Sequence, residues 1–269
     1  MKKILALMLA LLLMLTLVAC SDEENNNDDG GIDMTVTGTD QYFAAGGDYN
    51  DQYKYEYINA NQQVVITGFT SSHQPHAITL PTTINDRPVV EIGSQAFYNC
   101  KNITSVTIPE GVIKIGNLAF SDCTGLVTVA LPTTLQTIGN AAFSGCTLLT
   151  SPTFGSNISS IGYAAFFNCK SIKTIVLPDS LTAISDQAFM RCESLTSVSF
   201  GNELASIGKH AFSSCKKLET IVDGYPATLT SVGDYAFSNC EKLKAPIWAD
   251  NDEDSITVGE NAFYNTKKN

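Results

Sequence analysis

Apolar residues recur along most of this chain with one fixed period. The pattern Ile-Gly-x-x-Ala-Phe-x-x-Cys, complete or nearly so, begins six times at intervals of 23 residues, and two looser copies follow. The eight copies begin at Ile92, Ile115, Ile138, Ile161, Ile184, Ile207, Val232 and Val258. A repeat of this length is typical of a solenoid, because one unit cannot bury its apolar face without neighbours.

Two different spacings alternate inside each repeat. The segment Ile103-x-x-Val106-x-Ile108-Pro109 predicts a short strand whose large apolar side chains face inward and which the proline ends. The segment from Ile92 to Cys100 has helical spacing and predicts one or two short helical turns on the opposite wall. The predicted fold class is therefore α/β, leaning towards β.

Two repeats depart from the strand pattern. Pro152 and Pro246 stand where the inward strand valine belongs. A proline removes one hydrogen-bond donor from a parallel ladder, so we expect kinked or broken strands there.

The repeat resembles the BspA-like leucine-rich repeat family of bacterial surface proteins, from about Tyr53 to the C-terminus. In one copy the positions that carry the resemblance are Leu126, Val129, Leu131, Pro132, Leu135, Ile138, Gly139, Ala142, Phe143 and Cys146. The resemblance implies a right-handed leucine-rich repeat solenoid with a parallel sheet along one face. It also implies roles in adhesion to host or microbial ligands.

The first residues of the chain predict a targeting signal. Lys2 and Lys3 precede an apolar run, which ends at Leu17-Val18-Ala19-Cys20. This segment resembles a bacterial lipoprotein signal peptide over residues 1–19, which implies that Cys20 is acylated. A retained transmembrane anchor is the alternative, but the run is short for a bilayer span.

Residues 20–33 predict a flexible acidic tether, because they are polar and lack periodicity. The acidic residues just after Cys20 resemble an export signal to the outer face of the outer membrane, with a solvated charge run as the alternative. We therefore expect a lipid anchor in the outer membrane, facing the exterior, although a periplasmic location stays open.

Residues 34–91 do not follow the complete repeat pattern, and they predict an N-terminal β cap with a degenerate first coil. Tyr53, Tyr55 and Tyr57 alternate with charged residues, and a turn at 59–61 leads into an apolar run, as in a β-hairpin. Residues 92–269 form the predicted solenoid of about seven and a half repeats.

The charge of the chain restricts its partners. The formal net charge is −11, and it becomes −13 without Lys2 and Lys3, with 14 basic against 27 acidic residues. Binding to nucleic acid or to an anionic membrane by charge needs basic patches, so we expect neither.

Seven cysteines share one repeat position: Cys100, Cys123, Cys146, Cys169, Cys192, Cys215 and Cys240. Side chains in one column point the same way, which is poor geometry for a disulfide. We expect buried free thiols that donate weakly to backbone carbonyls. Metal binding is not indicated, because there is no Cys-x-x-Cys pair and no histidine in the column.

Candidate chemistry is sparse. Asp250, Asp252 and Asp254 match the first ligand positions of a calcium loop, but Ser255 replaces its glycine and Asn261 its closing glutamate. We expect a solvated insertion there, with calcium as the weak alternative. The three histidines, His73, His76 and His210, belong to no catalytic motif. We therefore expect no cofactor and no enzymatic activity.

The strand register predicts an outward, hydroxyl-rich and uncharged surface as the binding site. Its residues are Ser105, Thr107, Thr128, Ala130, Ser151, Thr153, Thr174, Val176, Ser197 and Ser199, followed by Thr220 and Val222. Well-exposed strand residues of this type also occur without any site.

A second candidate surface is an apolar patch of Tyr163, Phe167 and Met190, which is either exposed or part of the core. The predicted function is that of a cell-surface binding or adhesion lipoprotein with a host or microbial protein or glycan partner. A structural or assembly subunit of an outer-membrane complex is the first alternative, and an enzyme the second. Neither the ligand nor the oligomeric state follows from the sequence.

Overall fold

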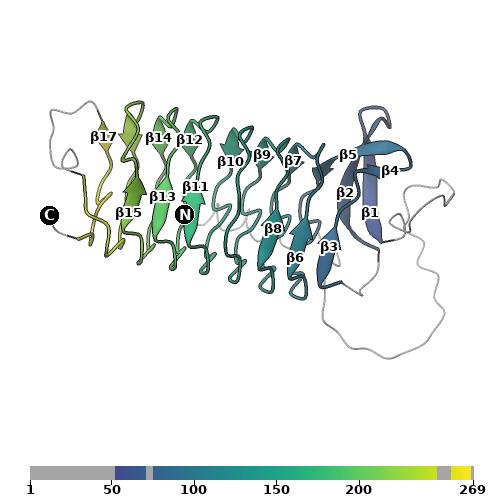
Figure 1. Cartoon of the computed structure of the whole chain (residues 1–269), viewed down its shortest axis with the longest axis horizontal. Helices are drawn as coiled ribbons and strands as arrows, with labels where there is room; N and C mark the ends of the chain where they lie inside the picture. Colours follow the sequence, from purple (N-terminus) through teal and green to yellow (C-terminus); the bar gives the residue numbers. More distant parts are fainter. Residues whose placement is uncertain (1–51, 71–74, 247–255, 268–269) are drawn as a thin grey trace, which may run out of the picture.

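The computed structural model describes residues 52–70, 75–246 and 256–267. In these ranges the chain is a β-solenoid of about eight turns. Its coils stack in one row from the hairpin of β1 (Tyr53–Ile58) and β2 (Gln63–Phe69) to β17 (Thr257–Val258), as Figure 1 shows. The described ranges contain no helix, and so none that is long and apolar enough to cross a membrane.

One wall of the solenoid consists of three-residue strands, and we call it the strand face. Its strands are β3 (Ala77–Thr79), β6 (Ser105–Thr107), β8 (Thr128–Ala130), β11 (Thr174–Val176), β13 (Ser197–Ser199) and β15 (Thr220–Val222). They form two parallel sheets, β3-β6-β8 and β11-β13-β15. In the strands β6, β8, β11 and β13 the middle side chain is buried, as the predicted alternation requires.

A second wall consists of two-residue strands, and we call it the glycine wall because glycine follows the strand in most coils. Its strands are β7 (Lys114–Ile115), β9 (Thr137–Ile138), β10 (Ser160–Ile161), β12 (Ala183–Ile184), β14 (Ser206–Ile207), β16 (Ser231–Val232) and β17. These strands also pair in parallel. The expectation of a parallel sheet along one face only is therefore wrong, since two walls carry parallel sheets.

The third wall, from the glycine to the repeat cysteine, contains turns and not the predicted helical turns. Two residues of each coil adopt a positive φ in this segment, for example Gln95 (60°) and Asn99 (58°) in the first coil. A right-handed helix has no place for such residues. The prediction of helical turns is wrong, although the apolar spacing on which it rested is real.

Hydrogen bonds between coils explain why turns replace a helix. The N–H groups of Gln95, Phe97 and Asn99 donate to carbonyls of the next coil at 2.7–2.9 Å, while the intervening N–H of Ala96 donates within its own coil to Gly93. In a helix these N–H groups would point along its own axis, towards carbonyls four residues back in the same coil and not towards the next coil. Stacking therefore selects an alternation of right- and left-handed residues, which turns every second N–H along the solenoid axis.

The core is a column of stacked coils. Eight phenylalanines form a ladder with ring centroids 5.2–5.4 Å apart: Phe97, Phe120, Phe143, Phe166, Phe189, Phe212, Phe237 and Phe263. The repeat cysteines are buried beside it, and six of them, from Cys123 to Cys240, are free thiols. Each donates to the phenylalanine carbonyl of the preceding coil at 3.0–3.4 Å. For these six, the predicted role is confirmed.

The N-terminal end of this core is closed by the hairpin, as the tyrosine alternation indicates. Strand β1 is antiparallel to β2, and β2 pairs in parallel with β5 (Arg87–Ile92), which pairs with β4 (Thr83–Ile84) and β7. Tyr53 is buried, and its ring packs against Phe69 and Phe97. The hairpin thus covers the first ring of the phenylalanine ladder.

Proline breaks the strand face where the sequence predicts it. Pro152 is buried at the position of the inward valine, and residues 151–153 form no strand, which separates β8 from β11. The coils remain stacked there, because Thr150 N–H donates to Val127 and Lys173 N–H donates to Thr150. Pro246 also lies outside any strand.

Candidate binding surface

The predicted strand-face residues lie on the outside of the solenoid. They are exposed or half-buried and flank a middle residue that is buried in β6, β8, β11 and β13 and half-buried in β15. Parallel pairing aligns Thr174, Ser197 and Thr220 in one column and Val176, Ser199 and Val222 in a second. A shorter pair of columns joins Ser105 to Thr128 and Thr107 to Ala130.

Ser151 and Thr153 connect these two sets of columns without belonging to a strand. Both residues are exposed and flank the buried Pro152. The predicted surface is therefore interrupted by one coil of irregular backbone between its N-terminal and C-terminal parts.

The hydroxyl groups of this surface are not used by the fold. Among the described residues, the side chains of Thr107, Thr128, Thr174, Ser197 and Ser199 make no hydrogen bond to another side chain or to the backbone. Their donors and acceptors are left to solvent or to a ligand.

Val176 adds apolar surface to the strand face. It is 66 % exposed, and Val222 in the same column is 38 % exposed. The strand face therefore offers apolar contact beside free hydroxyl groups, a combination found in binding surfaces.

The apolar patch of Tyr163, Phe167 and Met190 is only partly formed. Tyr163 is 48 % exposed, whereas Phe167 and Met190 are half-buried in neighbouring coils. The helical turn that would place Tyr163 over Phe167 is absent, because Ala164 between them has a positive φ. Tyr163 therefore protrudes, while Phe167 and Met190 are partly covered by the coils.

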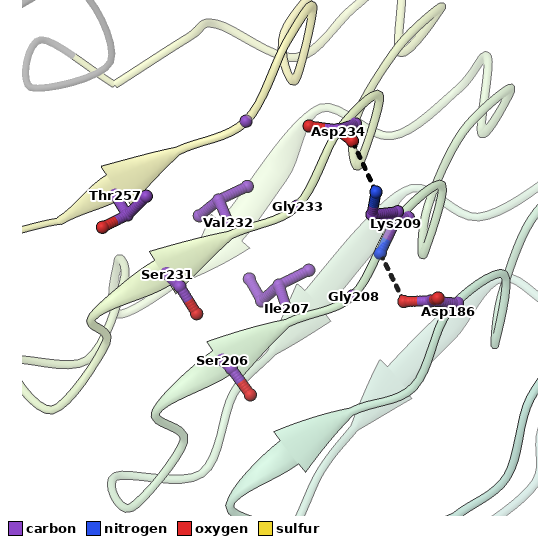
Figure 2. Close-up of a pocket in the computed structure, with 11 residues that line it drawn as sticks. Asp186, Ser206, Ile207, Gly208, Lys209, Ser231, Val232, Gly233, Asp234 and Thr257 are labelled. Carbon is purple, nitrogen blue, oxygen red and sulfur yellow. Dashed lines mark hydrogen bonds and ion pairs between the residues drawn. The ribbon is translucent and has the colours of Figure 1, made fainter.

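A shallow groove of about 330 Å³ crosses the C-terminal half of the glycine wall (Figure 2). Ser206, Ser231 and Thr257 line one side, and Asp186, Lys209 and Asp234 line the other. Gly208 and Gly233 lie between the two sides. Only glycine fits at these positions, because a Cβ there would come within 2.6–2.7 Å of the preceding coil. The sequence analysis did not predict this groove. Its signal in the sequence is the glycine that recurs at the same position of most repeats.

The charged groups of the groove hold one another ionised. Lys209 Nζ lies 2.8 Å from Asp234 Oδ2, and the backbone N–H of Lys209 donates to Asp186 Oδ1 at 2.7 Å. The hydrogen bond from Lys209 and the N–H of Glu260 lower the pKa of Asp234, while Asp234 raises the pKa of Lys209. A general acid or base needs a pKa near neutrality, and these shifts lead away from it.

Several predicted site residues lie outside the described ranges. These are Cys20, Asp250, Asp252 and Asp254. Within the described ranges, no group of three or more His, Cys, Asp or Glu side chains could hold a metal ion. The lipid anchor and the calcium alternative therefore stay predictions.

Comparison with known proteins identifies the repeat. Residues 90–219 and 162–269 match the model of the BspA type leucine rich repeat region, in six copies. No curated protein sequence matches the chain.

Solved structures of bacterial leucine-rich repeat proteins are similar over most of the chain. One is a leucine rich repeat protein of T. pallidum, with 31 % identity over 71 % of this chain and 87 % of that one, and a TM-score of 0.68. Another is a leucine rich cell surface protein of Faecalibacterium prausnitzii, with 25 % identity over 85 % and 76 %, and a TM-score of 0.56. A leucine-rich repeat protein of Bacteroides ovatus gives 25 % identity over 80 % and 67 %, and a TM-score of 0.55.

The family match covers well over half of the sequence, and the coils seen in the structure follow the same register. Families of this repeat type typically contain non-catalytic binding proteins. The chain belongs to the BspA-type leucine-rich repeat family and is related to bacterial leucine-rich repeat cell-surface proteins.

Proposed function

We propose that the protein is a lipid-anchored surface protein whose solenoid binds a protein or glycan partner in adhesion. The observation that carries this proposal is the strand face, where hydroxyl groups without protein partners lie in register beside the exposed Val176. A flat surface with a regular repeat suits an extended partner. The cell-surface relative from Faecalibacterium prausnitzii supports the same location.

Binding of the full-length protein, purified in detergent, to arrays of matrix proteins and neutral glycans tests the strand face. The variant carries Thr128→Lys and Thr174→Lys, which place long charged side chains on two strands of this surface. The matched control carries Ser160→Lys and Ala183→Lys, which add the same charge to exposed positions of the glycine wall. Loss of binding in the first variant alone supports the proposal, and equal binding by both contradicts it.

The proposed anchor requires acylation of Cys20, with residues 1–19 removed as a signal peptide. Cells that express the full chain should incorporate labelled palmitate into it, and Cys20→Ala should abolish the label. Protease treatment of intact cells then distinguishes the outer surface from the periplasm. A labelled protein that resists protease on intact cells would contradict the exterior location.

A structural or assembly subunit is the second candidate, and the half-buried pair Phe167 and Met190 favours it. Side chains of this kind gain further apolar burial when a partner covers them. If this candidate is right, Met190→Gln with Tyr163→Ser should release a co-purifying subunit or lower the oligomeric state, while array binding stays unchanged.

A further inference from the structure

One edge of the solenoid gathers positive charge, although the chain has a formal charge of −11. The edge lies between the repeat cysteine and the strand face, at the first, second and fourth positions after the cysteine. Seven of the sixteen basic residues of the chain occupy these positions: Lys101, Lys170, Lys173, Lys216, Lys217, Lys242 and Lys244. The negative net charge of the whole chain gives no sign of this basic edge. It becomes visible when the repeats are aligned, because the lysines then share the same positions.

The charge is concentrated in the last three coils, in what we call the lysine cluster: Lys216, Lys217, Lys242, Lys244 and Lys267. All five side chains are exposed. Within the described residues, none lies within 4.0 Å of a carboxylate oxygen, unlike Lys114, Lys170 and Lys209. Among the described residues, three glutamates, Glu193, Glu219 and Glu241, occupy the same edge and reduce its charge without cancelling it.

Stacking brings these like charges close together. Lys217 and Lys242 hold the same position in consecutive coils, whose phenylalanine rings are 5.3 Å apart. Lys244 and Lys267 lie directly opposite each other in a parallel bridge. Like charges in such pairs repel each other, so an anion placed between them relieves an unfavourable interaction.

We propose that the lysine cluster binds an acidic polysaccharide, with carboxylate or sulfate groups along an extended chain. A polymer that repeats its charge matches a column of ammonium groups that repeats with each coil. Stacking of single-stranded nucleic acid needs aromatic side chains, and the edge positions of the repeats contain none. This site is separate from the strand face and stands whether or not the strand face binds a partner.

Binding of the full-length protein to heparin and to polygalacturonate, over a series of salt concentrations, tests the proposal. Dextran is the neutral polysaccharide. The variant Lys217→Gln, Lys242→Gln, Lys244→Gln should weaken binding to both acidic polymers by at least about tenfold at low salt. The matched control Lys54→Gln, Lys114→Gln, Lys209→Gln removes the same charge elsewhere and should leave binding within about twofold of the unmodified chain.

The result that would overturn the proposal is equal loss in both triple variants, or binding to dextran as strong as binding to heparin. Tighter binding to duplex DNA than to either acidic polysaccharide at the same salt would also overturn it. Thermal unfolding of each variant shows whether it is folded. The strand-face variant Thr128→Lys, Thr174→Lys should keep heparin binding, which separates this site from the proposed adhesion surface.

Discussion

The hydroxyl of Ser185 donates a 2.6 Å hydrogen bond to the carbonyl of Ile161. In other coils a glycine backbone N–H makes the equivalent bond, as Gly139 does to Ile115 at 2.8 Å. Ser185 stands at the glycine position, where a Cβ has no room in the regular stack. The parallel ladder of the glycine wall stops at this coil, between β10 and β12. A side-chain bond thus replaces a backbone bond at the break.

Removal of the Ser185 hydroxyl should destabilise the solenoid. Ser185→Ala leaves the Ile161 carbonyl without this donor, which should lower the free energy of unfolding by about 1–2 kcal/mol. Urea denaturation measures the difference. Ser156→Ala, at an exposed position, should change it by less than about 0.5 kcal/mol. Equal stability of the two variants would mean that the backbone supplies the bond itself.

The glycine positions should tolerate no side chain. In Gly139→Ala the new Cβ would come within 2.6 Å of the backbone of Gly116, so the coils must separate. We expect a loss of about 2–3 kcal/mol in the free energy of unfolding. Gly224→Ala is the control, because a Cβ there meets nothing within 4 Å and only its φ of 80° is unfavourable. It should lose about 1 kcal/mol, and the reverse order would contradict this packing argument.

Residues with a positive φ in the third wall should limit stability. Arg191 is exposed with a φ of 63°, at the position where another coil has Gly145. Arg191→Gly should raise the free energy of unfolding by about 1 kcal/mol, because glycine adopts this conformation without steric cost. Lys216→Gly, at an exposed position without a positive φ, should lower it instead. The sign of each change in urea denaturation checks the prediction.

The buried thiols should make stability depend on alkaline pH. Burial raises the pKa of Cys123 to about 12, and burial also raises the pKa of Cys146 well above its usual value. The unfolded chain therefore loses these protons first, so stability is complete below pH 9 and falls as pH rises towards 12. Urea denaturation between pH 8 and 11 should show this decline, and Cys123→Ala should make it shallower. An identical slope in the variant would contradict the assignment.

The same thiols should be protected in the native state. At pH 8 an alkylating reagent should leave Cys123, Cys146, Cys169, Cys192, Cys215 and Cys240 unmodified, and unfolding in urea should expose all six. Mass spectrometry of the labelled peptides makes the comparison.

The sequence by itself determined the register of the solenoid. The 23-residue period fixed which side chains are buried in every coil, the proline at 152 predicted the break in the strand face, and the tyrosine alternation predicted the hairpin. These features depend on local spacing and on the N–H that proline lacks, so the sequence is enough to predict them. The outward orientation of Thr128 and Thr174 follows from the same alternation.

Only the tertiary structure decided how the coils contact one another. The apolar spacing between Ile92 and Cys100 fits both a helix and the turns that the structure shows. The turns form because every second N–H donates to a carbonyl of the next coil, which requires a positive φ at Gln95 and Asn99. The glycine groove and the opposition of Lys244 and Lys267 also arise between coils. A hydrogen bond or a charge pair across coils joins residues more than twenty positions apart, and no local pattern encodes its geometry.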